Sequence, residues 1–302
     1  MSAHPIAVIG AGLMGHGLAQ VFATAGHPVA LQDPSAEALG SARDRIAANL
    51  SALGGDAEAV QRVRLCERLA DAVADVTFVV EAAPERLEIK RSIFAELARL
   101  TGDDVVLASN TSVIPIGAIA EGIEGSQRIV GTHWWNPPYL VPLVEVVQAS
   151  CTSPDVVQRT LELLRSVGKE PVHVKRDVPG FVGNRLQHAL WREAIALVAD
   201  GVCDAETVDQ VVKSSFGRRL AVMGPLENAD YVGLDLTLDI HEHILPDLDR
   251  TAGASPYLRR LVEEHRLGMK TGRGFRTWAP GDQERLRRTL IEHLKPTPEI
   301  ET

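Results

Sequence analysis

Three polar segments of the sequence carry side chains that could transfer protons. They are residues 109–112 (SNTS), residues 133–138 (HWWNPP) with Glu145 beyond them, and residues 179–185 (PGFVGNR). Histidine has the free pKa best suited to proton abstraction near neutrality. A nearby carboxylate can fix the imidazole tautomer, and a hydroxyl or an amide can orient a reacting oxygen. The three segments therefore indicate acid–base chemistry.

A glycine-rich segment, residues 10–15 (GAGLMG), indicates a dinucleotide site. It follows a predicted strand and opens a predicted helix, whose free N–H groups and dipole favour a pyrophosphate. Gly10, Gly12 and Gly15 would allow the backbone to approach closely, with Leu13 and Met14 between them. A glycine turn that only caps a helix is the alternative interpretation.

An acidic residue, Asp33, ends the next predicted strand. A carboxylate at this place would accept hydrogen bonds from the ribose hydroxyls of adenosine, and it would repel a 2′-phosphate. NAD is therefore favoured over NADP. The glycine motif alone also allows FAD, and the rest of the chain favours NAD. An unrelated surface acid is the alternative for Asp33.

These residues must be positioned by regular elements, and the first half of the sequence alternates short apolar runs with amphipathic segments. This pattern is typical of a parallel sheet covered by helices. The predicted strands are 6–9, 29–32, 76–80, 105–108, 129–132, 143–147 and 172–174, and the predicted helices include 13–24, 35–53 and 87–100. The expected fold class is α/β, with a Rossmann-type doubly wound N-terminal domain.

The pattern changes after Val174, because long amphipathic segments replace the apolar runs. Pro179 suits the first turn of a helix, and this helix carries apolar residues on two faces, with Val182 on one and Trp191 on the other. We expect an NAD-binding domain over 1–177 and an all-helical substrate and dimerisation domain over 178–302. Burial on two faces suggests a homodimer.

Composition excludes several classes of function. The net charge is -9 and no dense block of lysine and arginine is present, so nucleic acid is not an expected partner. The three cysteines are far apart, and His241 and His243 lack a third ligand, so neither disulfides nor a metal site are expected. The sequence has no basic, apolar leader and no run of about 18 apolar residues. We expect a cytoplasmic protein that does not bind membranes.

The ordered motifs resemble the 3-hydroxyacyl-CoA dehydrogenase family over nearly the whole chain. Besides the glycine segment, the matching motifs are SNTS, HxxNP, LVEV, PGFVxNR, MGPLE and LGMKTGRGF. The resemblance implies an NAD-dependent dehydrogenase and a homodimer. It makes His133 the base and Glu145 its partner.

The same resemblance assigns further site residues, each with an ordinary alternative. Ser112, Asn136 and Asn184 would line the reacting centre, although Asn184 could instead cap or cross-link helices. Glu85 and Lys90 match positions that contact the nicotinamide half of the cofactor, but a solvated helix end fits them nearly as well. The two tryptophans after His133 are expected to pack beneath the site.

Departures from the family pattern concern the substrate. Members that use acyl-CoA carry a lysine-rich helix after the second strand, whereas residues 35–56 here contain no lysine. Arg43 and Arg45 could partly substitute. The combination of residues 133–139 (HWWNPPY), residues 141–145 (VPLVE) and Arg219 looks like the lambda-crystallin and L-gulonate 3-dehydrogenase branch. A bidentate arginine would suit a free carboxylate; a surface turn is the alternative for Arg219.

The predicted reaction is therefore oxidation of the 3-hydroxyl of a small free 3-hydroxy carboxylic acid, similar to L-gulonate, 3-hydroxybutyrate or carnitine, to the 3-keto acid. An (S)-3-hydroxyacyl-CoA is the main alternative substrate. Oxidation of an aldehyde through its hydrate, and a non-enzymatic crystallin-like or NADH-binding role, are further alternatives.

Overall fold

A computed structural model describes residues 4–295 and divides into two compact units. Within the described residues, the first unit comprises 4–185 with 291–295, and the second comprises 186–290. The division after Arg185 falls in the first turns of a helix, whereas the predicted division after Asp177 follows the last strand. The predicted domain boundary stays a prediction.

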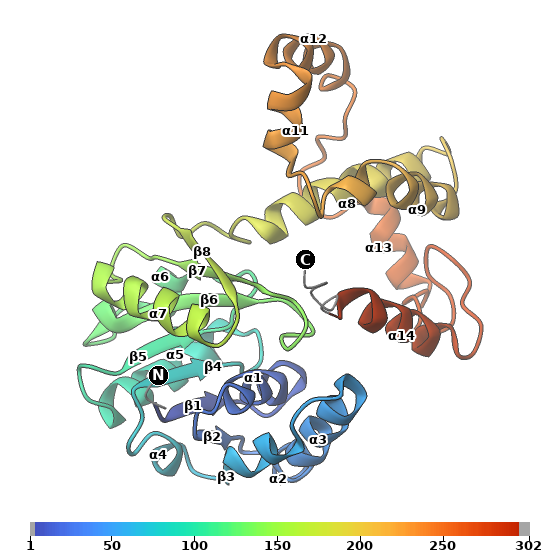
Figure 1. The fold of residues 1–302 in the computed structure, drawn as a ribbon. Helices are drawn as coiled ribbons and strands as arrows, with labels where there is room; N and C mark the ends of the chain where they lie inside the picture. Colours follow the sequence, from blue (N-terminus) through green and yellow to red (C-terminus); the bar gives the residue numbers. More distant parts are fainter. Residues whose placement is uncertain (1–3, 296–302) are drawn as a thin grey trace, which may run out of the picture. The chain divides into compact units, whose positions relative to one another are not determined.

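The first unit is built on an eight-stranded sheet with the order β3-β2-β1-β4-β5-β6-β7-β8 (Figure 1). Neighbouring strands are parallel except β6 and β7, which are antiparallel. The strands are β1 (Ile6–Ile9), β2 (Val29–Gln32), β3 (Val63–Cys66), β4 (Phe78–Glu81), β5 (Val106–Ser109), β6 (Ile129–Trp134), β7 (Leu143–Val147) and β8 (Glu170–Val174). The predicted α/β doubly wound fold is confirmed.

Helices of the first unit connect these strands. They are α1 (Leu13–Thr24), α2 (Ala36–Gly40), α3 (Ala42–Leu53), α4 (Leu69–Ala72), α5 (Leu87–Leu100), α6 (Ile116–Ala120), α7 (Pro154–Ser166) and the 3₁₀ turns η1 (Ala57–Arg62) and η2 (Ser126–Arg128). The single helix predicted over 35–53 is wrong, because the chain breaks at Ser41 between α2 and α3.

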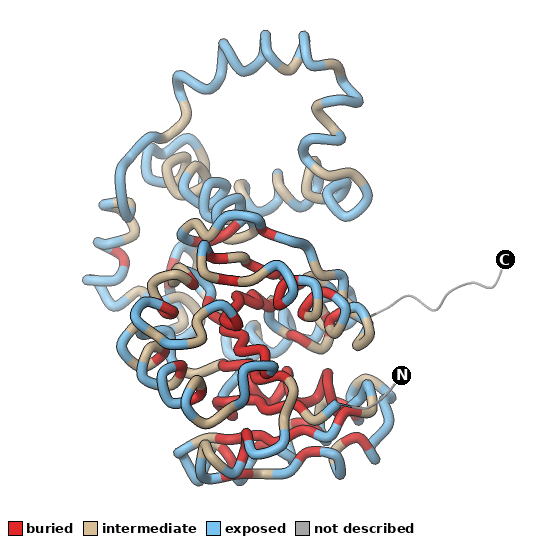
Figure 2. Tube along the Cα trace, turned by 90° about the vertical axis from the view of Figure 1, so that its left-hand side faces the viewer, coloured by how far each residue is buried: buried red, intermediate tan, exposed pale blue. Residues whose placement is uncertain are grey.

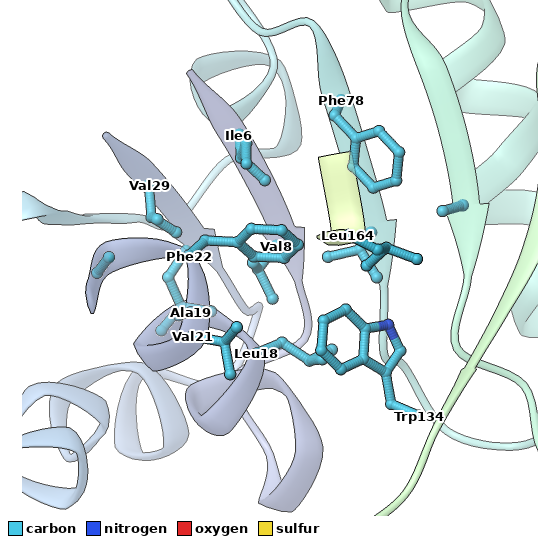
Figure 3. Packing of buried hydrophobic residues seen from close by; sticks show 14 of the residues in the cluster. Ile6, Val8, Leu18, Ala19, Val21, Phe22, Val29, Phe78, Trp134 and Leu164 are labelled. Carbon is cyan, nitrogen blue, oxygen red and sulfur yellow. The ribbon is translucent and has the colours of Figure 1, made fainter. Parts of the chain in front are cut away.

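Two apolar clusters form because alternate strand residues point to opposite faces of the sheet. Ile6 and Val8 pack with α1, α3 and α7, while Ala7 and Ile9 pack with α5 and α6. Figure 3 shows the first cluster, in which Phe22 of α1 lies beside Trp134, the last residue of β6. The two faces together hold the carboxyl ends of the strands in fixed positions.

The second unit is helical. Its helices are α8 (Gly183–Ala199), which begins in the first unit, α9 (Ala205–Ser214), α10 (Phe216–Arg219), α11 (Pro225–Val232), α12 (Leu234–Ile244), α13 (Pro256–Glu263) and α14 (Asp282–Leu294). Leu261 is the only apolar side chain buried between residues 186 and 290, and Figure 2 shows these helices largely as exposed or intermediate. No helix within residues 4–295 is long and apolar enough to cross a membrane.

Two predictions for α8 differ from the structure. Pro179 does not lie in its first turn, because Gly180 and Phe181 both have positive φ and the helix begins only at Gly183. The chain turns sharply here, which a helix from Pro179 would not allow. Neither face of α8 is buried within the single chain.

Candidate active site

A buried histidine–glutamate pair stands on the antiparallel strands β6 and β7. The register places His133 directly opposite Glu145, and His133 Nδ1 lies 2.8 Å from Glu145 Oε2. Only 4% of His133 and 1% of Glu145 are exposed. Directly opposed residues in a sheet face the same side, so the reversal of β7 is what brings the two side chains together.

The second oxygen of Glu145 is held by backbone groups at the start of α8. Oε1 accepts hydrogen bonds from the N–H groups of Val182 at 2.8 Å and of Gly183 at 3.0 Å. Burial alone would raise the pKa of Glu145, but the hydrogen bonds from His133, Gly183 and Val182 together lower it below its usual value. Glu145 is therefore anionic and accepts from a protonated Nδ1, which leaves His133 Nε2 free to accept a proton.

The loop after β5 lies beside this pair and is fastened by Glu85. Glu85 Oε1 accepts from Thr111 Oγ1 at 2.6 Å and from the N–H groups of Ser112 and Val113 at 2.9 and 3.1 Å. Burial would raise the pKa of Glu85, but the bond from Thr111, the charge of Lys90 and the two backbone bonds lower it. Glu85 therefore fixes the backbone of the loop that carries Ser112.

Asn184, in the first turn of α8, reaches the same loop. Its Nδ2 donates to the carbonyl oxygen of Ser112 at 2.8 Å. An amide nitrogen has two N–H donors, so one of them remains for another acceptor. Asn184 thus joins α8 to the loop after β5, rather than linking two helices as the alternative role predicted, and this bond also orients the amide.

Lys90 lies beneath the loop and does not line the site as the resemblance had implied. Its side chain is fully buried, with Nζ 2.8 Å from Glu81 Oε1 and 3.4 Å from Glu85 Oε2. Ser109 Oγ donates to the other oxygen of Glu81 at 2.7 Å. A buried ammonium needs carboxylate partners, and the direction in which this side chain points could not be read from the sequence. Sequence reasoning missed Glu81, whose place at the end of a buried strand was the available signal.

A cavity of about 890 Å³ in the first unit collects most of the predicted residues. Its lining includes Gly10, Gly12, Leu13, Met14, Asp33, Glu85, Ser112, His133, Asn136 and Asn184. Trp134 and Trp135 also line it. The Trp135 ring lies 5.1 Å from that of His133, and Trp134 also belongs to the apolar core. Gly15 and Glu145 lie behind the lining, and Arg219 is exposed on α10 of the second unit.

The glycine segment fits a dinucleotide. A Cβ on Gly15 would lie 1.6 Å from the carbonyl oxygen of Gly10, and Gly10 itself has φ +102°, so both must be glycine for the turn to form. A Cβ on Gly12 would meet nothing within 4 Å, so the backbone there faces open space. The first turn of α1 has no acidic residue and no side-chain cap. Its free N–H groups can therefore bind a pyrophosphate.

Asp33 completes this end of the cavity. Oδ2 accepts from the N–H of Ala11 at 2.7 Å, and Oδ1 accepts from the N–H of Ser35 at 2.8 Å. Each carboxylate oxygen can accept a further bond, so the side chain is oriented for ribose hydroxyls. The residues present therefore fit NAD.

Comparison with known proteins agrees with this geometry. Residues 5–178 match the family model described as 3-hydroxyacyl-CoA dehydrogenase, NAD binding domain, and residues 180–278 match the model of the C-terminal domain. The chain is 39% identical to an L-carnitine dehydrogenase of Nocardiopsis dassonvillei, with 73% of this chain and 68% of the relative covered. It is 36% identical to a 3-hydroxybutyryl-CoA dehydrogenase of Bradyrhizobium diazoefficiens, with 89% and 94% covered.

A solved structure is also similar. It is that of 5-formyl-3-hydroxy-2-methylpyridine 4-carboxylic acid 5-dehydrogenase, described as an NAD⁺-dependent dismutase. The TM-score is 0.90 at 35% sequence identity, with 97% of this chain and 96% of that chain covered. With a glycine segment that fits NAD and a buried histidine–glutamate pair at the same cavity, the chain belongs to the 3-hydroxyacyl-CoA dehydrogenase family and is an NAD-dependent dehydrogenase acting on CH–OH groups.

Proposed function

We propose that the chain oxidises the 3-hydroxyl of a small free 3-hydroxy carboxylic acid to the 3-keto acid. This proposal rests on the hydrogen bonds that Arg43 and Arg45 donate. Arg43 donates to the carbonyl oxygen of Val63 through Nε at 2.9 Å and Nη2 at 2.5 Å. Arg45 Nη2 donates to the carbonyl oxygens of Ala11 at 2.6 Å and Ala38 at 2.9 Å.

Both arginines are thus committed to backbone carbonyls of the fold. Residues 35–56 contain no lysine and no other arginine, so this stretch offers no uncommitted cation to the phosphates of coenzyme A. The absence of such a cation favours an acid without the nucleotide. In this proposal, Arg43 and Arg45 do not take the place of the lysines that bind coenzyme A in other family members.

In the proposed mechanism, the substrate hydroxyl lies against His133 Nε2, which takes its proton. Bound NAD supplies the two-electron acceptor. Glu145 keeps the proton on Nδ1 and stabilises the imidazolium that forms, since its own pKa is lowered. The free N–H of Asn184, together with Ser112 and Asn136 at the cavity wall, orients the reacting oxygen and stabilises the charge that develops on it.

Arg219 is proposed to bind the substrate carboxylate in a bidentate manner. Within residues 4–295 it makes no ion pair at 4.0 Å or less, so its guanidinium is available. Arg219→Met should raise KM for the acid at least tenfold while kcat falls less. The neighbouring Arg218→Met is the matched control and should leave KM within twofold.

The experiment that tests the function is NADH formation by the purified protein with L-gulonate, 3-hydroxybutyrate, carnitine and 3-hydroxybutyryl-CoA. We expect kcat/KM for one free acid to exceed that for the thioester by at least tenfold. His133→Ala should abolish turnover, whereas the exposed control His243→Ala should not. A preference for the thioester would refute the free-acid proposal.

A second candidate is oxidation of an aldehyde through its hydrate. The similar structure with TM-score 0.90 is that of a dehydrogenase whose substrate carries a formyl group and a carboxylate on a pyridine ring. A hydrate presents a hydroxyl to His133 as an alcohol does, and the Trp135 ring at the cavity could stack on an aromatic substrate. Pyridine aldehydes that carry a carboxylate should therefore be added to the panel.

We further propose that two copies of the chain associate through the second unit, and that the protein is cytoplasmic. The unit has a single buried apolar side chain, whereas Leu226 and Tyr231 of α11 are 80% and 79% exposed. Large exposed apolar surfaces mark interfaces. Light scattering should give twice the chain mass of 32.6 kDa. The double variant Leu226→Glu/Tyr231→Glu should give a lower mass, and the control Asp230→Asn should not; a monomeric wild type would refute the association.

A further inference from the structure

A half-buried lysine without a carboxylate partner holds the loop that joins the two strands of the histidine–glutamate pair. Lys169 lies between α7 and β8, and its Nζ donates to the carbonyl oxygens of Pro138 at 2.6 Å and Val141 at 3.1 Å. Nζ also lies 5.8 Å from the ring centre of Trp134. Among the described residues, no carboxylate is within 4.0 Å of it, and burial lowers its pKa to about 8.

The loop depends on this donor because of its sequence. Residues 135–142 (WNPPYLVP) contain three prolines, which have no N–H to donate. The N–H groups of Leu140 and Val141 both bond to the carbonyl oxygen of Pro137, so they do not serve the carbonyls of Pro138 and Val141. An unpartnered buried carbonyl destabilises a fold, and Lys169 provides donors to both.

Residues of the 135–142 loop link Lys169 to the reaction. Trp135 and Asn136 line the cavity, and the loop's two ends continue into His133 on β6 and Glu145 on β7. Even partial burial of an ammonium without a carboxylate partner is costly, and an apolar side chain would fill the same space without that cost. The two carbonyl contacts therefore account for a charged group at this place.

We propose that Lys169 is a positioning residue for the dehydrogenase reaction, whose ammonium fixes the 135–142 loop and thereby places Asn136 and Trp135 against the substrate. This inference rests on the proposed role of the His133 site. Lys169 touches neither substrate nor cofactor and acts through the loop. The aromatic face of Trp134 helps to hold the ammonium in place.

Three variants test the proposal. Lys169→Met removes the donor, Lys169→Arg keeps a permanent charge and several donors, and Lys175→Met, at an exposed lysine just after β8, is the control. We expect Lys169→Met to lower kcat/KM for the hydroxy acid at least tenfold, with the dissociation constant for NADH changed less than twofold. Lys169→Arg should recover a large part of the loss, and Lys175→Met should match the wild type.

The pH profile gives a readout that a purely structural role would not move. Trp134 and the two carbonyls face Lys169, with no acidic or basic side chain within ion-pair distance in the described part of the chain. The protonation of Lys169 should therefore not depend on the ionisation of a neighbouring side chain. In the wild type, kcat/KM should fall above about pH 8 as the ammonium loses its charge. In Lys169→Arg this alkaline fall should be absent, and its persistence would overturn the proposal.

Hydrogen exchange separates this proposal from the proposed function. The amides of Leu140 and Val141 should exchange at least tenfold faster in Lys169→Met than in Lys175→Met, whatever the substrate is. Unchanged exchange in a folded Lys169→Met protein would refute the role of Lys169 while leaving the function intact. Faster exchange in a protein that oxidises none of the hydroxy acids would refute the proposed function, but it would still support the role of Lys169 in fixing the 135–142 loop.

Discussion

Replacing Glu145 by glutamine tests how the active site controls the proton of His133. The two side chains have the same shape, but the amide has one acceptor and one donor end. Glu145 Oε1 accepts from the N–H groups of Val182 and Gly183. If the glutamine nitrogen faced these groups, two partly buried N–H donors would lose their acceptor, at about 1 kcal/mol or more each. The glutamine oxygen therefore stays there, and its NH₂ faces His133 Nδ1.

That orientation forces the wrong tautomer. Nδ1 must now accept a hydrogen bond, so the proton of the neutral imidazole moves to Nε2, which can no longer take the proton of the substrate. A general base contributes about 10²–10⁴-fold to the rate, or roughly 3–5 kcal/mol of barrier. We expect kcat of Glu145→Gln to fall by that factor, with NADH affinity unchanged within threefold.

The assay is steady-state kinetics with the best substrate of the panel, with Glu170→Gln as the control because Glu170 is exposed on the neighbouring strand β8. Nitrogen NMR of labelled histidine should report a proton on Nε2 in Glu145→Gln and on Nδ1 in the wild type. A kcat within threefold of the wild type, or an unchanged tautomer, would show that the backbone donors do not set the orientation.

Four further expectations follow from the same structure. Gly15→Ala should destabilise the fold by about 3 kcal/mol or more in urea unfolding, because of overpacking against Gly10. Gly12→Ala should keep wild-type stability yet weaken NADH binding at least tenfold by fluorescence titration, and equal effects of the two changes would contradict this. Lys90→Met should cost about 3–5 kcal/mol, because Glu81 is left buried without its partner; adding Glu81→Gln should recover part of that loss. The pKa of Glu85 is lowered in the fold, so its contribution to stability is present above the unfolded pKa of about 4.3 and is lost as pH falls through the lower folded value. Urea midpoints between pH 6 and 3 should therefore drop less steeply in Glu85→Gln.

Sequence patterns correctly predicted the strands and helices whose apolar residues follow one regular pattern. The bounds of β1, α1 and α5 agree with the prediction, because continuous apolar or amphipathic runs leave one interpretation. Strand β3 was not predicted, since its VRLC sequence has buried residues only at its ends. The start of α8 was misplaced because Phe181 adopts a positive φ that a sequence pattern does not reveal.

The cavity residues were largely those expected, whereas the groups behind them were not. Ordered motifs mark residues that face a ligand, but the direction of a long charged side chain is decided by packing. Arg45 and Lys90 both turn inward to bond the fold, and Lys169 binds a loop rather than an acid. None of these choices leaves a signal in residue spacing.

Leu261 is the only apolar side chain buried among residues 186–290. The stability of the second unit should therefore depend on the concentration of the chain. If a second copy supplies the missing core, the stability of the unit rises by about 1.4 kcal/mol for each tenfold increase in chain concentration. Dilution would then lower the free energy of unfolding of these helices without any change in temperature or urea concentration. Unfolding midpoints of the two units measured at micromolar and at nanomolar chain should diverge, with only that of residues 186–290 moving.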